Sequence, residues 1–293
     1  LPANGTAGNY LRTLNFENSE IKVFWTDDKG DWIRKTFASR PDNVVVQLLT
    51  APEGKTLNVD ISLEKSAAWS MTSGMDWGAL RGIGSVDPDM AAFVQLTADQ
   101  KKLAPKGVEA GKISQEIDEN NLVYKCQLDP STDKSGYAAV TRVIRNSGSS
   151  KINKGTLKIE NASSVMLLTR IEYFPEFNDA HAGALIKDLK GLSTDYSVLL
   201  ERHQKVQSEM LNRVKLDLGG NFQYGLSTEE LWSNQLSRHD LSPAILEKLF
   251  GMGRYWFIIN SGRYPVLSAG INSTINLQNE GAVQGDLKEG MEA

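Results

Sequence analysis

The sequence predicts a mainly β fold of the α+β class, in which an antiparallel β-sandwich is followed by helices. Strand-like segments of alternating apolar and polar residues follow one another as far as residue 173. Short turns rich in Asn, Asp, Gly, Ser and Pro separate these segments, which is typical of an antiparallel sandwich. After Pro175 the apolar residues recur at helical spacing instead, so the helices are expected in the second part of the chain.

Length and composition limit the class of protein. The chain has 293 residues, 40% of them hydrophobic and 23% charged, as expected for a globular protein of roughly two domains. The net charge of -4 argues against a nucleic-acid partner, because neutralising phosphates requires clustered Lys and Arg. No run approaches the roughly 18 consecutive apolar residues of a membrane span. The single cysteine, Cys126, excludes an internal disulfide and is expected to be buried as a small apolar residue.

Two groups of strands are predicted around a less regular segment, residues 66–110, which holds a helix-like stretch near 96–102. In one strand Leu57, Val59 and Ile61 alternate with polar residues, which indicates a half-buried strand. The predicted strands are 9–16, 20–26, 31–39, 43–50, 56–65, 121–128, 137–146, 155–161 and 163–174.

The first predicted helix covers residues 192–214, with Ser193 or Thr194 as its N-terminal cap. Residues 214–220, VKLDLGG, are interpreted as a short strand that ends in a glycine turn, which Asp217 can support. The predicted element order in this region is therefore helix, strand and turn.

Two further helices are predicted from their start signals. Ser227 or Thr228, followed by two glutamates, indicates a helix start in STEELW. Residues 243–262 form an apolar helical pattern with Ser242 as the cap and Pro243 as the first residue. An apolar helix so near the end of the sequence is expected to open a helical domain that continues beyond Ala293.

Most motifs for common chemistries do not occur in the sequence. RGIGS (81–85) lacks the strand, third glycine and helix of a phosphate-binding fingerprint. The histidines His181, His203 and His239 lack metal-ligand spacing, so no metal or cofactor is predicted, and His203 is expected to be a packing residue. No Ser or Cys nucleophile motif is present.

The loop GINSTINLQNE (270–280) is the strongest candidate for a site. It concentrates the amides of Asn272, Asn276, Gln278 and Asn279 after the apolar helix. Amides offer both donors and acceptors, which suits sugar hydroxyls or an attacking water. The alternative is a loop that only caps a helix, because Asn and Ser are ordinary capping residues.

Three segments resemble the family 95 glycoside hydrolases. WIRKTFASRPDNVVVQLL (32–49) is similar to a run in that family's N-terminal sandwich. HQKVQSEMLNRVKLDLGG (203–220), followed by STEEL, is similar to its linker, and LFGMGRYWFIINSGR (249–263) to its first barrel helix. The resemblance covers most of the chain.

The resemblance implies a β-supersandwich at residues 1–175, a helical linker at 176–240 and, at 241–293, the start of a truncated (α/α)6 catalytic barrel. It implies inverting hydrolysis of α-L-fucosides or related α-L-galactosides, with a Glu as general acid and a water activated by Asn side chains and an Asp. The acid and the Asp are expected after Ala293, and the family's first strands before this sequence. The partners implied are a glycan substrate and the remaining barrel of the same protein, with no cofactor, in a secreted or periplasmic bacterial protein.

The family's water-activating N-I-N segment corresponds to T-I-N here. Asn276 matches the second asparagine and is predicted to position the water, while Thr274 replaces the first. Asn272 and Gln278 are the predicted substrate-binding residues. Thr274 indicates a divergent branch, and the alternative function is a carbohydrate-binding or scaffolding protein of the same architecture without the chemistry.

Overall fold

A computed structural model describes residues 7–63, 112–127, 134–220, 223–236 and 240–261. The chain forms two compact units. The sandwich unit comprises Leu1–Arg12 and Lys22–Tyr196, and the helical unit comprises Thr13–Ile21 and Ser197–Ala293. The mainly β, α+β class predicted from the sequence is confirmed.

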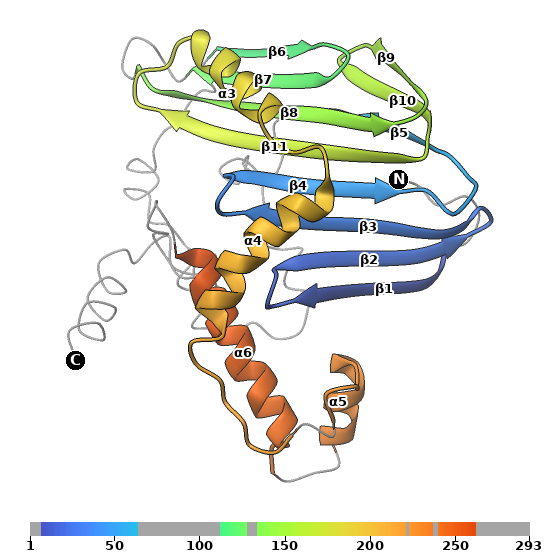
Figure 1. Ribbon diagram of the computed structural model, residues 1–293, viewed down its shortest axis with the longest axis vertical. Coiled ribbons are helices and arrows are strands. Elements are labelled where there is room, and N and C mark those ends of the chain that lie inside the picture. Colours follow the sequence, from blue (N-terminus) through green and yellow to red (C-terminus); the bar gives the residue numbers. More distant parts are fainter. Residues whose placement is uncertain (1–6, 64–111, 128–133, 221–222, 237–239, 262–293) are drawn as a thin grey trace, which may run out of the picture. The chain divides into compact units, whose positions relative to one another are not determined.

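The larger sheet has eight strands in the order β1-β2-β3-β4-β11-β8-β7-β6 (Figure 1). The pairs from β3 to β6 along this order are all antiparallel. The strand bounds are β1 Gly8–Asn15, β2 Glu20–Asp27, β3 Gly30–Ser39, β4 Val44–Thr50, β6 Ile113–Ile117, β7 Asn121–Gln127, β8 Gly136–Asn146 and β11 Ser164–Phe174.

A smaller antiparallel sheet, in the order β5-β10-β9, forms the second layer of the sandwich. Its strands are β5 (Leu57–Ile61), β10 (Thr156–Ala162) and β9 (Ser149–Asn153). Alternate residues of both sheets point between the layers, so their apolar side chains form one core. The buried members of this core are Trp32, Ala51, Leu57, Ile61, Leu122, Val143, Leu157, Ile159, Ala162 and Val165.

Helix α3 (Ala180–Lys190) packs against β7, β8 and β11 of the larger sheet. It buries Ala182, Leu185 and Leu189, which are spaced three and four residues apart as one helix face requires. The ring of His181 stacks on Phe174 of β11 at a centroid distance of 4.0 Å. The sequence analysis did not predict α3, because its 11 residues contain only a narrow apolar stripe.

All nine predicted strand segments contain a strand, and Cys126 is buried as expected. The sequence analysis missed β6 and β9. Both are short edge strands whose residues are largely exposed, so they carry no alternating apolar pattern. The helix-like stretch predicted near 96–102 lies outside the described residues.

The helical unit contains α4 (Tyr196–Leu211), α5 (Thr228–Gln235) and α6 (Pro243–Asn260). The predicted caps of the last two are confirmed. Ser227 and Glu230 form a reciprocal capping box at α5, and the Ser242 hydroxyl accepts a hydrogen bond of 3.3 Å from the Ile245 amide at α6. His203 is buried on α4, in agreement with its predicted packing role.

The strand predicted at 214–220 is wrong, because these residues form an irregular loop. The Glu247 carboxylate of α6 accepts hydrogen bonds from the amides of Leu218 and Gly220, so these amides do not join a sheet. Asp217 supports the turn as expected, since its Oδ1 accepts a hydrogen bond of 2.9 Å from the Gly219 amide.

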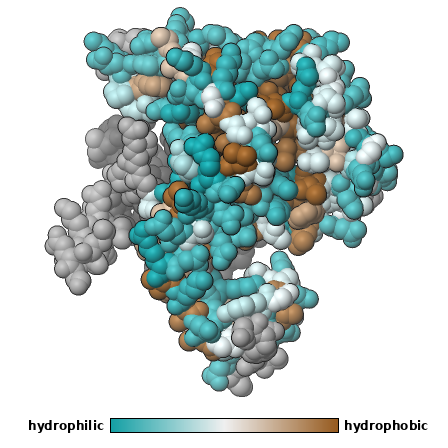
Figure 2. All heavy atoms as spheres, viewed as in Figure 1, coloured by the Kyte–Doolittle hydropathy of each residue, from teal (hydrophilic) through white to brown (hydrophobic). Residues whose placement is uncertain are grey.

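The visible face of the β-sandwich is mostly hydrophilic, with apolar residues gathered in smaller patches between the polar ones (Figure 2). Within the described ranges, none of the helices has the length and apolar character needed to cross a membrane.

Candidate functional site

The four residues predicted to form the site are Asn272, Thr274, Asn276 and Gln278. All four lie in residues 262–293, outside the described part of the chain. Their roles in water positioning and substrate binding therefore stay predictions.

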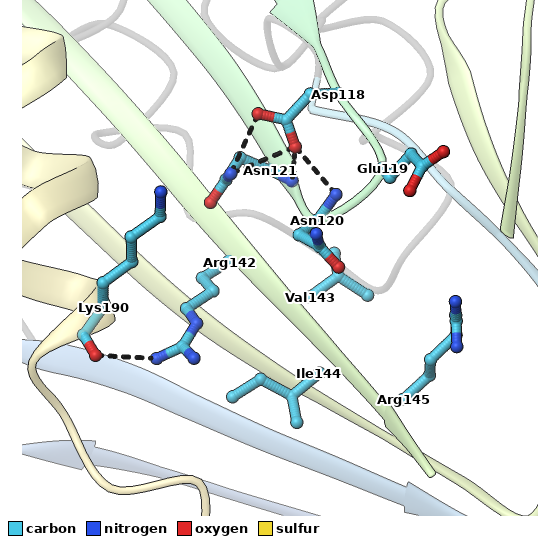
Figure 3. A pocket seen from close by; sticks show the side chains of 9 residues that line it. All are labelled: Asp118, Glu119, Asn120, Asn121, Arg142, Val143, Ile144, Arg145 and Lys190. Carbon is cyan, nitrogen blue, oxygen red and sulfur yellow. Dashed lines mark hydrogen bonds between the residues drawn. The ribbon is translucent and has the colours of Figure 1, made fainter. Parts of the chain in front are cut away.

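The sandwich unit carries a polar pocket of about 590 Å³ (Figure 3). Its walls come from the β6–β7 turn, the C-terminal part of β8 and the last residue of α3. This volume lies within the range of roughly 300–1,000 Å³ that is common for small-ligand sites. We call it the turn pocket; its lining residues are Asp118, Glu119, Asn120, Asn121, Arg142, Val143, Ile144, Arg145 and Lys190.

Asp118 fixes the shape of the turn. One of its oxygens accepts hydrogen bonds from the backbone amides of Asn120 at 2.7 Å and Asn121 at 2.8 Å. The Asn121 side-chain NH2 group donates to both oxygens, at 3.0 and 2.9 Å. Partial desolvation raises the pKa of Asp118, but these hydrogen bonds and the nearby Lys190 outweigh it and hold the pKa below its ordinary value. Asp118 is thus an ionised structural anchor of the turn.

The orientation of the Asn121 amide follows from this anchor. Because both Asp118 oxygens accept hydrogen bonds, the NH2 group must face Asp118 and the carbonyl oxygen must face away. Figure 3 shows the Asn121 oxygen on the side toward Lys190. Asn121 is only 4% exposed, and its Oδ1 has no hydrogen-bond partner among the described residues. This oxygen is fully buried, and a buried acceptor without a partner costs free energy.

Three cationic side chains line the turn pocket, Arg142 and Lys190 on one side of β8 and Arg145 on the other (Figure 3). The Arg142 guanidinium donates to the main-chain carbonyls of Leu189 at 2.8 Å and Lys190 at 3.4 Å, which satisfies the C-terminal end of α3. Arg145 makes one long contact of 3.4 Å to the Gly148 carbonyl. The exposed Lys190 ammonium forms no ion pair or hydrogen bond with any residue in the described ranges. Arg145 and Lys190 are therefore available to a ligand.

The turn pocket is lined mainly by polar and charged side chains. Its other lining residues, Val143 and Ile144, point to opposite sides of β8, and Val143 belongs to the core between the sheets. Its carboxylate Asp118 is engaged in the turn, and the described lining residues include no Ser, Cys or His nucleophile. In the described ranges, no three or more His, Cys, Asp and Glu residues are grouped so as to hold a metal ion.

The helical unit has a second, more apolar pocket of about 690 Å³ near α4, α5 and α6. Glu247 lies in its wall and is the most connected polar group there. The Tyr224 hydroxyl donates a hydrogen bond of 2.6 Å to Glu247 Oε2, and the backbone amides of Leu218 and Gly220 donate to Glu247 Oε1. The hydrogen bond from Tyr224, the largest cause, and those from the two amides hold the pKa of Glu247 below its ordinary value. The hydrogen bond that Tyr224 donates to Glu247 is in turn the main reason that the pKa of Tyr224 is raised to about 12. Glu247 thus fixes the loop between α4 and α5.

Sequence reasoning missed both groups. The residues DENN at 118–121 are indistinguishable from an ordinary polar turn, and Arg142 and Lys190 are far from them along the chain. From the sequence alone, Glu247 cannot be told from an ordinary exposed residue of a helix. Only the strand pairing and the helix contacts bring these side chains together.

The fold defines a domain built on an antiparallel β-sandwich. Residues 1–173 match the family described as glycosyl hydrolase family 65, N-terminal domain, and the chain belongs to this family. The predicted relation to glycoside hydrolases is therefore confirmed, although the matching family is not the predicted family 95.

The chain is also similar to alpha-L-fucosidase 2 of Arabidopsis thaliana, with 25% identity over 274 residues. The alignment covers 87% of this chain and 29% of that protein, so the chain spans less than a third of the relative's length. Among solved structures it is similar to one titled "Putative kojibiose phosphorylase from human microbiome", with a TM-score of 0.43 and 9% identity over 70% of this chain and 25% of that one.

Proposed function

We propose that the protein containing this chain hydrolyses α-L-fucosides or related α-L-galactosides with inversion of configuration. The observation that carries the proposal is the similarity to alpha-L-fucosidase 2. It covers 274 residues, whereas the family match ends at residue 173, so it includes helical-unit sequence as well as the sandwich.

The character of α6 supports the proposal that a helical catalytic barrel begins here. A defined cap and Pro243 start the helix. Beyond Gly253 it exposes large apolar side chains, with Phe257 67% and Trp256 42% exposed. Large exposed apolar side chains on one helix are typical of a helix that packs against further elements.

The motifs shared with family 95 glycoside hydrolases support the same assignment. The RVKLDLGG segment ends in the loop that Glu247 holds through the Leu218 and Gly220 amides. In this proposal the loop and α6 bring residues 270–280 to the substrate, Asn276 and Thr274 orient the attacking water, and Asn272 and Gln278 bind the sugar. A secreted or periplasmic location is part of the proposal and is testable by cell fractionation.

The test is whether the full-length protein hydrolyses an α-1,2-linked fucosyl oligosaccharide and an aryl α-L-galactoside. We expect release of the terminal sugar. Asn276→Ala should lower kcat by about 100-fold or more with little change in KM, because placing a water matters most in the transition state. Asn279→Ala, the same substitution in the same loop, serves as the control. Equal effects of the two substitutions contradict the role of Asn276, and saturable binding without release supports a carbohydrate-binding protein instead.

A further inference from the structure

We propose that the first turn of α3 is a pH-sensitive device, which opens when the imidazole of His181 takes up a proton. The device belongs to the sandwich unit and does not depend on fucoside hydrolysis. Two features of the geometry carry the inference: a hydrogen bond that only the neutral imidazole can accept, and a ring stack that holds the imidazole in place.

Asn178 and the first turn of α3 hold each other through three hydrogen bonds. The Asn178 side-chain oxygen accepts from the Ala180 amide at 3.0 Å, and its main-chain carbonyl accepts from the His181 amide at 3.2 Å. In return, the Asn178 amide donates to His181 Nδ1 at 3.2 Å. Asp179, the N-terminal cap residue of α3, makes no capping hydrogen bond with its side chain. Asn178 and His181 therefore supply the polar contacts that start the helix.

The hydrogen bond to Nδ1 requires a neutral imidazole. A ring nitrogen that accepts from an N–H group carries no proton, and protonation of the ring turns both nitrogens into donors. The new proton on Nδ1 then faces the N–H group of Asn178. A positive ring in the first turn also lies at the positive end of the helix dipole, which is unfavourable. The contact of His181 with Asn178 therefore stabilises the turn while the imidazole is neutral, and this contribution is lost as the pH falls.

Aromatic packing holds the imidazole beside Asn178. The His181 ring lies parallel to that of Phe174 on β11, with an interplanar angle of 2° and a centroid distance of 4.0 Å. Phe177 lies tilted against the same ring at 6.1 Å. Phe177 is closely packed in turn, because a Cβ atom at Gly136 of β8 would lie only 2.7 Å from its ring. The face of Phe174 attracts a positive ring, but the proton lies in the ring plane and still points at the Asn178 amide.

No carboxylate among the described residues forms an ion pair with His181. The charged groups on the elements around α3 and beside them are Lys112, Glu116, Lys125, Lys134, Arg142, Arg170, Glu172, Glu176 and Asp179. Lys125 of β7 pairs with Asp179 at 2.9 Å, and Arg170 of β11 pairs with Glu172 at 2.9 Å. The two carboxylates that start α3 and face it from β11 are thus engaged by other cations. A proton on the imidazole is therefore not held by a salt bridge.

The ion pair of Lys125 with Asp179 limits how far the helix opens. Hydrogen bonds to Glu116 and Asp179 raise the pKa of Lys125, and the bond from Lys125 holds the pKa of Asp179 below its ordinary value. Both groups therefore stay charged between about pH 8 and pH 5, the range in which histidine takes up a proton. At the other end of α3, Arg142 keeps its bond to the main chain. We expect the first turn to open while the rest of the helix stays on the sheet.

Hydrogen exchange of the full-length protein at about pH 7.5 and about pH 5.5, expressed as protection factors, tests the proposal. We expect protection in residues 178–182 to fall about tenfold at the lower pH, whereas residues 185–190 keep theirs. His181→Asn places an amide oxygen near the position of Nδ1 and so keeps an acceptor that does not titrate. His181→Phe keeps an aromatic ring but has no acceptor. Both variants should lose the pH dependence.

Three results overturn the proposal. The first is protection in residues 178–182 of the wild type that does not change with pH. The second is the wild-type pH dependence in either His181→Asn or His181→Phe. The third is an equal loss of protection in residues 185–190, because the whole helix then leaves the sheet. None of these results bears on the release of fucose, so the two proposals fail separately.

Discussion

The guanidinium of Arg142 on β8 donates a hydrogen bond of 2.8 Å to the main-chain carbonyl of Leu189 in the last turn of α3. Leu189 is itself fully buried, so the same residue gives α3 an apolar anchor and a polar one. A cation at a helix C-terminus also interacts favourably with the helix dipole. This pair thus attaches α3 to the larger sheet and shapes the turn pocket.

Arg142→Met should loosen α3. The substitution keeps much of the apolar stem but leaves the Leu189 carbonyl without its donor, which costs about 1–2 kcal/mol. Hydrogen exchange should therefore become faster for amides of residues 180–190. Arg145→Met, on the same strand, removes only the 3.4 Å contact to Gly148 and should leave this exchange unchanged. Equal exchange in the two variants contradicts the anchoring role of Arg142.

Glu247→Gln should lower the melting temperature by a few degrees at neutral pH, because the amide cannot accept as strongly from Tyr224, Leu218 and Gly220. The folded-state pKa of Glu247 lies below its ordinary value of 4.5. Its contribution to stability is therefore full above pH 4.5 and is lost as the pH falls through the folded-state pKa. The gap in melting temperature between the wild type and Glu247→Gln should shrink at acidic pH.

The matched control for this pH experiment is Glu209→Gln on α4. The side chain of Glu209 is 71% exposed, and its one ion pair with a described residue is that with Arg213, at 3.1 Å. An exposed pair of this kind contributes little to stability. A melting-temperature gap for Glu247→Gln that is no larger than that for Glu209→Gln, or that grows toward acidic pH, is incompatible with the proposed loop anchor.

Ser227→Ala should destabilise α5 by about 0.5–2 kcal/mol, because it removes the side-chain acceptor of the Glu230 amide. Circular dichroism at 222 nm during urea unfolding, together with hydrogen exchange of residues 228–235, measures the effect. Ser233→Ala replaces an exposed serine inside the same helix and should be neutral or slightly stabilising, because alanine favours helices. A larger loss of stability for Ser233→Ala than for Ser227→Ala contradicts the capping box.

Leu157→Ala should destabilise the sandwich by about 2–5 kcal/mol, because Leu157 is fully buried between the sheets and the substitution leaves a cavity. Ile152→Ala, on the neighbouring strand β9, removes a side chain that is 48% exposed and should cost much less. Urea unfolding midpoints compare the two. Similar midpoints contradict the two-layer core.

Sequence patterns predicted the elements that bury one regular face. The alternation around Leu57 and Ile61 identified β5, and the Ser227 and Ser242 start signals identified α5 and α6. These signals are local, because burial on alternate residues and capping need only neighbouring positions. Exposed edge strands such as β6 carry no such pattern.

The groups that depend on tertiary contacts could not be predicted in this way. Lys190 reaches the turn at Asp118 only through the packing of α3 on β8. Glu247 meets Leu218 through a loop that the apolar alternation of VKLDL wrongly indicated as a strand. Asn276 and Thr274 were predicted from a resemblance to a family, and their roles remain to be measured.

The most direct test of the central claim is the release of L-fucose from an α-1,2-linked fucosyl oligosaccharide by the full-length protein, followed by proton NMR of the anomeric signal in the first minutes. The α-L-linkage and an inverting mechanism predict that β-L-fucose appears first and then mutarotates. Initial release of α-L-fucose contradicts the inverting mechanism. No release of L-fucose or L-galactose by the folded protein contradicts the assignment as a hydrolase of these sugars.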